Sequence, residues 1–187
     1  MKRIFAAIDI SEESRIKAAE HIVALRDVSQ KERIRWVNPE LLHITLMFVG
    51  EIDERSFFRF VWTVENTAKN FVPFEIALSN AGIFLRSGIA NVLWLGVDDD
   101  SGSLTAIAKQ MSMDFSSNLV DANRRFRPHL TIARSKYLSN KSKTVSEHLK
   151  RGFGPINERV SEIVIYESTL LPQGPIYKVL SKTKLGT

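Results

Sequence analysis

The chain of 187 residues contains no cysteine. This absence excludes disulfide bonds, thiolate zinc sites and a cysteine nucleophile, and it fits a reducing compartment. No apolar run is long enough to span a bilayer. Asp9 and Glu12 also interrupt the short apolar start of the chain too early for a signal peptide. We therefore expect a cytoplasmic protein that does not bind a membrane.

Histidine is scarce, with four in the chain, yet two of these lie inside matching apolar segments. The first segment reads LLHITLMFVG and contains His43, and the second reads RPHLTIARSK and contains His129. They are 86 positions apart (129 − 43), and each has the pattern histidine, aliphatic, threonine, aliphatic. A composition of 44% hydrophobic and 25% charged residues is otherwise that of an ordinary globular protein with one core.

Excess positive charge points to an anionic partner. The formal net charge of +5 is consistent with an ordinary basic surface, but its distribution is uneven. Five basic residues surround His129 between residues 123 and 136, with one phenylalanine and no acidic residue among them. Such a cluster is typical of proteins that bind phosphate-bearing ligands. The cluster comprises Arg124, Arg125, Arg127, Arg134 and Lys136.

Hydrophobic periodicity predicts an α+β chain in which strands and helices alternate. We expect a hinge-like loop at Arg86–Asn91 and no low-complexity linker. Helices are predicted at 12–26, 53–69, 103–119 and 138–150. Strands are predicted at 3–10, 43–50, 74–84, 91–98, 129–133, 161–171 and 176–185, with a strand edge near Trp36.

The two motifs occupy equivalent places in this order of elements. Asp9 precedes His43 by 34 positions, and Val97 precedes His129 by 32. Internal duplication is the simplest account. We predict a single domain, residues 1–187, made of two interleaved pseudo-symmetric lobes from approximate repeats 1–88 and 89–187. The lobes would face each other across a pseudo-twofold axis.

Alternation along a strand places the histidine and threonine of each motif on one face, with the aliphatic residues toward a core. Two imidazoles and two hydroxyls from His43, Thr45, His129 and Thr131 would then converge on one cleft. One histidine can act as a base and the other as an acid near neutral pH, while threonines and arginines contact phosphate oxygens. This chemistry requires no metal, and the sequence lacks an H-E-x-x-H motif.

A structural role for the motif histidines is the alternative. A single His-x-Thr on an apolar strand is usually a packed structural histidine, whereas two copies at equivalent places favour function. His21 and His148 lie on predicted helices without a partner motif, and we interpret both as surface or packing residues.

These residues resemble the 2H phosphoesterase superfamily, and more narrowly the bacterial and archaeal RNA 2',3'-cyclic phosphodiesterases, also called 2'-5' RNA ligases. The resemblance covers nearly the whole chain. It rests on five segments in order: RIFAAIDISEE, RWVNPELLHITLMFVGEI, VLWLGV, FRPHLTIAR and VIYESTLLPQGPIYKVL. It implies a fold of two α+β lobes whose antiparallel sheets form a V-shaped cleft.

The resemblance also implies hydrolysis of an RNA 2',3'-cyclic phosphate to a 2'-phosphate without a cofactor. His43 would be the proton donor to the departing 3'-oxygen, and His129 the proton acceptor from water. Thr45, Thr131 and Arg134 would bind the phosphate. Strict alternation sends Arg134 to the face opposite His129, so its role requires the strand to end or bulge near Ala133.

Three functions therefore compete. The first is a metal-independent cyclic phosphodiesterase that acts on RNA ends or cyclic nucleotides. The second is a non-catalytic module that binds RNA ends or nucleotides, in which the histidines only contact phosphate. The third is the reverse reaction, 2'-5' ligation of RNA, which the same acid and base could catalyse. We expect a monomer, because the cleft is built within one chain.

Overall fold

The computed structural model describes residues 1–115 and 126–186 and has a mixed α/β fold. Its strands form one nine-stranded sheet. Neighbouring strands are antiparallel, and this arrangement was predicted. The helices are α1 (Glu12–Val28), α2 (Glu54–Lys69), α3 (Ser103–Asp114), α4 (Lys143–Arg151) and the short 3-10 helix η1 (Pro39–Leu41). The strands are β1 (Lys2–Asp9), β2 (Arg35–Trp36), β3 (His43–Ile52), β4 (Phe74–Arg86), β5 (Ile89–Asp98), β6 (His129–Arg134), β7 (Ile156–Val160), β8 (Glu162–Leu171) and β9 (Gly174–Lys184).

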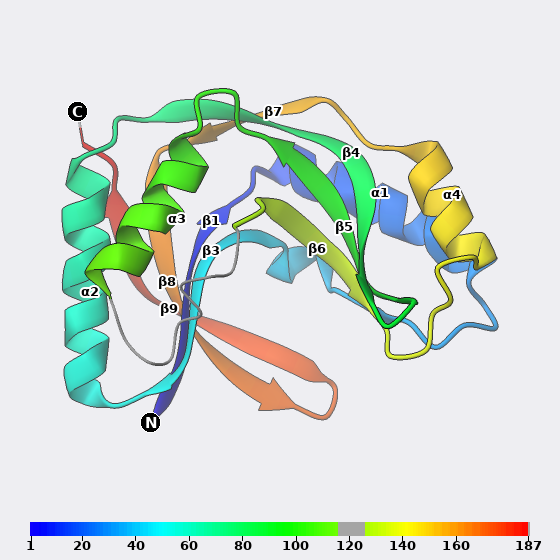
Figure 1. Cartoon of the computed structure of the whole chain (residues 1–187), viewed down its shortest axis with the longest axis horizontal. Helices are drawn as coiled ribbons and strands as arrows, with labels where there is room; N and C mark the ends of the chain where they lie inside the picture. Colours follow the sequence, from blue (N-terminus) through cyan, green and yellow to red (C-terminus); the bar gives the residue numbers. More distant parts are fainter. Residues whose placement is uncertain (116–125, 187) are drawn as a thin grey trace.

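The sheet consists of two sets of strands that meet at β3 and β6. Its order is β7-β4-β5-β6-β3-β1-β8-β9, and β2 pairs with β6 outside this path. Helices α2 and α3 pack together at one end of the molecule, and α1 and α4 pack together at the other (Figure 1). These two sets of strands do not coincide with residues 1–88 and 89–187, whose relation by duplication stays a prediction.

Most elements lie where the sequence pattern predicts them, with three differences. Arg86–Asn91 is not a hinge-like loop, because Ser87 (φ 50°) and Gly88 (φ 77°) form a two-residue turn between paired strands β4 and β5. The short strand β7 is not predicted, since its five residues INERV contain two charges. Helix α4 begins at Lys143, and not at residue 138 as predicted. Ser142 caps it by accepting a hydrogen bond from the Val145 amide. Residues 116–119 of the predicted third helix lie outside the described residues.

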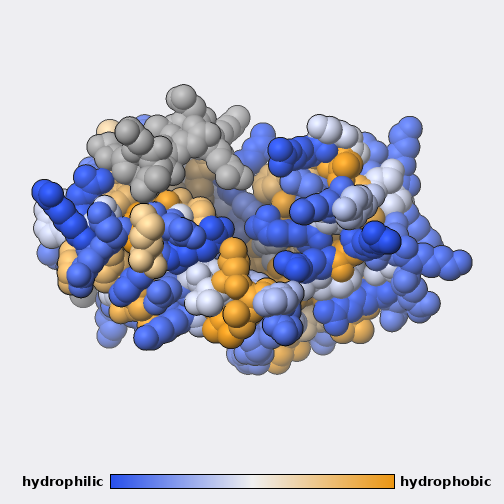
Figure 2. Space-filling model, turned by 90° about the horizontal axis from the view of Figure 1, so that it is seen from below, coloured by the Kyte–Doolittle hydropathy of each residue, from blue (hydrophilic) through white to orange (hydrophobic). Residues whose placement is uncertain are grey.

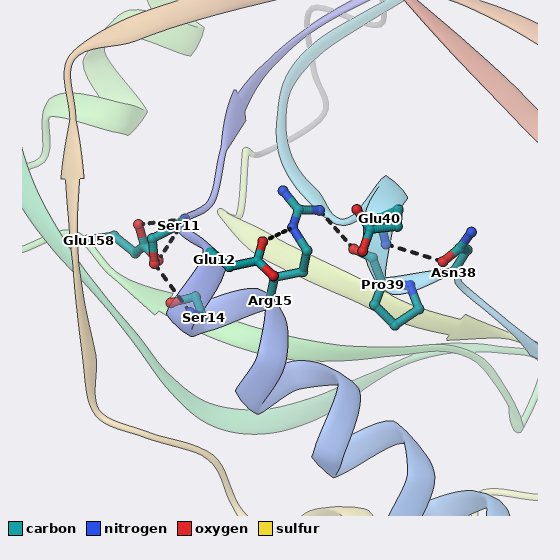
Figure 3. Close-up of polar contacts among 8 residues, drawn as sticks. All are labelled: Ser11, Glu12, Ser14, Arg15, Asn38, Pro39, Glu40 and Glu158. Carbon is teal, nitrogen blue, oxygen red and sulfur yellow. Dashed lines mark hydrogen bonds and ion pairs between the residues drawn. The ribbon is translucent and has the colours of Figure 1, made fainter.

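Polar contacts around the start of α1 connect three segments near the motif strand β3 (Figure 3). The Ser11 hydroxyl caps α1 by accepting from the Ser14 amide at 3.2 Å, and it donates to Glu158 of β7 at 2.6 Å. Arg15 of α1 donates to the Pro39 carbonyl at 2.9 Å. Helix η1 ends two residues before His43, so these contacts fix the entry of the chain into β3.

The β8–β9 hairpin extends away from the body of the molecule (Figure 1). Figure 2 shows the molecule from the side toward which the hairpin points, where hydrophilic residues predominate and hydrophobic ones are scattered. Every helix within the described ranges is too short or too polar to cross a membrane.

His21 and His148 form a buried pair between α1 and α4. Of the two interpretations given for them, the packing role is therefore correct and the surface position is wrong. Their side chains are 5% and 0% exposed. His148 Nε2 lies 3.0 Å from the Gly82 carbonyl, which can only accept, so this nitrogen carries a proton. His148 Nδ1 then accepts from His21 Nε2 at 2.9 Å. The pair therefore fits best when both rings are neutral.

Because this pair is buried, we expect the protein to lose stability in mild acid. Burial, then the charges of His148 and Arg151, lower the pKa of His21 from 6.5 to about 4. The unfolded chain therefore takes up a proton at a higher pH than the folded one, and stability is lost as pH falls from about 6.5 to about 4. The loss attributable to His21 is about 3 kcal/mol. Urea unfolding measured across this pH range is expected to show it.

Carboxylates also titrate in this range, so the His21→Gln variant provides the control. Glutamine can still donate to His148 Nδ1 but does not titrate, and its unfolding free energy should depend less steeply on pH. Equal pH slopes for the two proteins would contradict the prediction.

Candidate active site

The two motifs meet through a single strand pairing. Ile44 of β3 pairs with Leu130 of β6, antiparallel, and both side chains are fully buried. The residues directly before and after Ile44 and Leu130 in the sequence point to the other face of the sheet, away from the core. His43 and Thr45 therefore share a face with His129 and Thr131, and all four are partly exposed. The antiparallel direction places His43 beside Thr131, and Thr45 beside His129.

Both motif histidines are fixed in the same tautomer. His43 Nδ1 lies 2.8 Å from the Leu41 carbonyl, and His129 Nδ1 lies 2.7 Å from the Arg127 carbonyl. A carbonyl can only accept, so Nδ1 carries the proton in both rings. Nε2 is then the nitrogen that gains or loses a proton. In its neutral form each ring can act as a base at Nε2, and in its cationic form as an acid.

Aromatic side chains pack around each imidazole. Phe5 of β1 stacks on His43 with ring centroids 4.8 Å apart, and Tyr177 of β9 meets the same ring edge-on at 5.4 Å. Phe84 of β4 meets the His129 ring edge-on at 4.9 Å. Packing of this kind restricts each ring to one orientation, which proton transfer to a bound substrate requires.

Burial lowers the pKa of His43 below its usual value of 6.5. The hydrogen bond to Leu41 and the charge of Asp9 oppose this effect, while the charges of Arg134 and His129 add to it. The ring thus lies within electrostatic reach of β1 on one side and of β6 on the other. Burial combined with specific charged neighbours makes His43 a candidate functional residue.

Arg134 reaches the histidine face because β6 bulges. Trp94 of β5 pairs with Thr131, but the preceding residue of β5 pairs with Ala133, so Ile132 is an extra residue on β6. The bulge shifts the alternation by one residue, as the predicted role of Arg134 requires. Its charge lowers the pKa of both His43 and Tyr177, which places its guanidinium near both rings.

The rest of the predicted basic cluster is only partly described. Arg127 and Lys136 are exposed, and Arg124 and Arg125 lie outside the described residues. Within the described ranges, no group of three or more histidine, cysteine, aspartate or glutamate side chains could hold a metal ion.

Sequence reasoning missed the residues that β1 and the β8–β9 hairpin contribute. Asp9, Phe5, Tyr166 and Tyr177 all contact or face His43, although they lie near opposite ends of the chain. Alternation along β1 places Phe5 and Asp9 on the same face of the sheet. This pattern in the sequence could have indicated that both residues contribute to the site. No local pattern could indicate that the hairpin tyrosines pack against the same ring.

Comparisons with known proteins agree on one family. The sequence profile described as the 2'-5' RNA ligase superfamily matches residues 14–170. A relative from Thermotoga maritima, named RNA 2',3'-cyclic phosphodiesterase, is 34% identical over 178 residues, covering 95% of this chain and 92% of its own. One of the same name from Methanothermobacter thermautotrophicus is 32% identical and covers 94% of each chain.

Solved structures show the same fold. TT0787 of Thermus thermophilus superposes with a TM-score of 0.80 and 24% identity, covering 98% of this chain and 97% of its own. Escherichia coli LigT in complex with 3'-AMP superposes with a TM-score of 0.76 and 24% identity, covering 100% and 99%.

Proposed function

Because the chain belongs to the 2'-5' RNA ligase superfamily, we propose that it hydrolyses RNA 2',3'-cyclic phosphate ends to 2'-phosphates, with His43 and His129 as acid and base. The pairing of Ile44 with Leu130 is the observation that carries this proposal, because it brings both histidines and both threonines to one face. The activity named for the curated relatives supports the same substrate.

In the proposed reaction, His129 Nε2 accepts a proton from a water molecule, whose oxygen attacks the phosphorus. The bond between phosphorus and the 3'-oxygen breaks, and His43 Nε2 donates its proton to that oxygen. The products are a 2'-phosphate and a 3'-hydroxyl. Exchange of protons with solvent then returns His43 to the cation and His129 to the neutral ring. Because the two rings complete the proton transfers, the step requires no metal ion.

Thr45, Thr131 and Arg134 are proposed to bind the phosphate. The two hydroxyls can donate to its non-bridging oxygens, and the guanidinium can stabilise the negative charge that develops in the transition state. The positions of Thr131 beside His43 and Thr45 beside His129 support this, because a phosphate between the rings would lie between the hydroxyls as well. One chain supplies every proposed group, which is consistent with a monomer.

Ligation of RNA is the same reaction with a different nucleophile. A 5'-hydroxyl in place of water would give its proton to His129 and attack the phosphorus. The bond between phosphorus and the 3'-oxygen would break, His43 would protonate that oxygen, and a 2'-5' bond would remain. The concentration of water favours hydrolysis. A non-catalytic RNA-end binding module, the other alternative, would contact phosphate through the same histidines without turnover.

The test is the product formed from a dinucleotide that ends in a 2',3'-cyclic phosphate. We expect conversion to the 2'-monophosphate at the same rate with and without excess EDTA, because histidines perform both proton transfers. Chromatography against authentic 2'- and 3'-monophosphates identifies the product. Activity that disappeared with EDTA and returned with a divalent ion would contradict the mechanism, and binding without turnover would favour the binding module.

A further inference from the structure

A second arginine lies beside Arg134 on the face of the motif histidines. Arg35 of β2 pairs directly with Arg134 of β6, in antiparallel direction. Residues directly opposite each other on antiparallel strands point to the same face, with their Cβ atoms about 5 Å apart. Because the charge of Arg134 reaches the His43 ring, Arg35 also points to the side of the sheet where the phosphate is proposed to bind.

Arg33 continues this positive surface along the same segment. Ile34 and Trp36 pack against the core. Alternation along the chain therefore turns Arg33 and Arg35 outward, and both are exposed. The Ser135 hydroxyl donates to the Arg33 carbonyl at 2.7 Å, which holds the segment beside the end of β6.

Tyr137 places an exposed aromatic ring next to these arginines. Its side chain is 70% exposed, and the Arg33 guanidinium lies over the ring, 6.0 Å from its centroid. Proteins that bind single-stranded nucleic acid combine exposed rings, on which bases stack, with cations that contact the phosphates. The surface formed by Arg33, Arg35 and Tyr137 has both components.

Nearby carboxylates do not neutralise this surface. Within residues 1–115 and 126–186, neither Arg33 nor Arg35 forms an ion pair with an acidic side chain. Glu32, directly before Arg33, instead accepts a hydrogen bond from the Thr144 hydroxyl, which also places the surface beside α4. Uncompensated positive charge of this kind attracts a polyanion.

We propose that Arg33, Arg35 and Tyr137 form a track for single-stranded RNA, which binds the nucleotides that precede the 2',3'-cyclic phosphate end. The two arginines contact successive phosphates, and Tyr137 stacks on a base. Two residues of extended chain span about 6.6 Å, which is similar to the distance between neighbouring phosphates in an extended strand. The inference rests on the proposed function and deepens it, because it makes polynucleotide ends the preferred substrates over mononucleotides.

The kinetic test uses two substrates with the same reacting group. One is a mononucleoside 2',3'-cyclic phosphate, and the other is an RNA of about ten nucleotides with the same terminal nucleotide. In the Arg33→Gln/Arg35→Gln variant, the ratio of kcat/KM for the RNA to kcat/KM for the mononucleotide should fall about 20-fold, or roughly fivefold per exposed charge. The change should come from KM for the RNA, because these contacts lie outside the reacting group. An unchanged ratio would overturn the inference.

Fluorescence anisotropy measures the track without turnover, with a labelled RNA of the same length that ends in a 2'-phosphate. The slope of log affinity against log salt concentration should be shallower by about 1.4 in the double variant, because each phosphate contact of a single strand contributes about 0.7. An unchanged slope would overturn the track. Salt-dependent binding that requires both arginines, with no turnover, would support the track and overturn the proposed phosphodiesterase function instead.

Arg55→Gln/Lys69→Gln is the matched control. It removes two exposed positive charges from α2, which lies with α3 at the end of the molecule opposite α1 and α4 (Figure 1). The substrate ratio and the salt slope should stay within twofold and about 0.3 of the unmodified protein. Losses equal to those of Arg33→Gln/Arg35→Gln would show that net charge, and not position, governs RNA binding, and they would overturn the inference.

Tyr137→Leu tests the stacking contact. Leucine keeps an apolar side chain at this exposed position but lacks a ring, so affinity for the labelled RNA should fall about fivefold, at the lower end of what one stacked base contributes. The salt slope should not change, because stacking releases no counterions. Tyr137→Phe, which keeps the ring, should retain the affinity. Equal affinities of the leucine variant and the unmodified protein would contradict the role of Tyr137.

Discussion

Replacing His43 or His129 with alanine is expected to lower kcat about 1,000-fold for a 2',3'-cyclic dinucleotide. Removal of a general acid or base typically costs a factor of 100 to 10,000. Both rings are only partly buried, and the core residues Ile44 and Leu130 are unchanged in these variants. Circular dichroism and thermal unfolding should therefore match the unmodified protein.

The pH profiles of the two variants should differ in a way that a purely structural role would not produce. Loss of the base should flatten the acidic limb, and loss of the acid should flatten the alkaline limb. The double variant should be little slower than either single one, because the acid and base act in one step. Retention of a tenth or more of kcat in either single variant would refute the two-histidine mechanism.

Gly96→Ala is expected to destabilise the fold by about 3 kcal/mol. The new methyl group would lie 2.4 Å from the Ser79 backbone oxygen, which cannot move without shifting β4. Asn80, at φ 60° in a bulge of β4, directly follows Ser79. Insertion of a methyl group into packed structure costs about 1–3 kcal/mol, and a rigid backbone neighbour places this site at the upper end. Urea unfolding at pH 7.5 measures the change.

Gly88→Ala provides the comparison. Gly88 lies in the β4–β5 turn at φ 77°, and nothing lies within 4 Å of where its Cβ would be. Its cost should come from backbone conformation alone, about 1 kcal/mol. Equal destabilisation by the two substitutions would show that β4 and β5 are not as closely packed at Gly96 as the structure indicates. Because Gly96 pairs with His129, Gly96→Ala should also reduce kcat, whereas Gly88→Ala should not.

Local patterns predicted much of the fold and the part of the candidate site that lies on the two motif strands. The apolar tetrads around His43 and His129 predicted two strands with histidine and threonine on one face, and this face relation depends only on alternation along a strand. The predicted helices at 12–26 and 53–69 correspond to α1 and α2, since each has a capping residue and apolar residues at helical spacing. The requirement for a bulge near Ala133 also followed from alternation alone.

Contacts between distant parts of the chain decided the rest. Asp9 and Tyr166 are 157 positions apart, and no pattern within either segment indicates that one donates a hydrogen bond to the other. The turn at Ser87 and Gly88 was misjudged for a similar reason, because a polar, glycine-containing segment suits a flexible loop as well as a tight turn. Only the pairing of β4 with β5 distinguishes them.

The sequence by itself determined which side chains the two motif strands present, because alternation is a property of neighbouring residues. The tertiary structure alone decided that β3 lies beside β6, that the β8–β9 hairpin surrounds one histidine, and that Asp9 and Gly96 face the two rings. Strand order and register depend on packing between residues far apart in the chain, which no local pattern specifies.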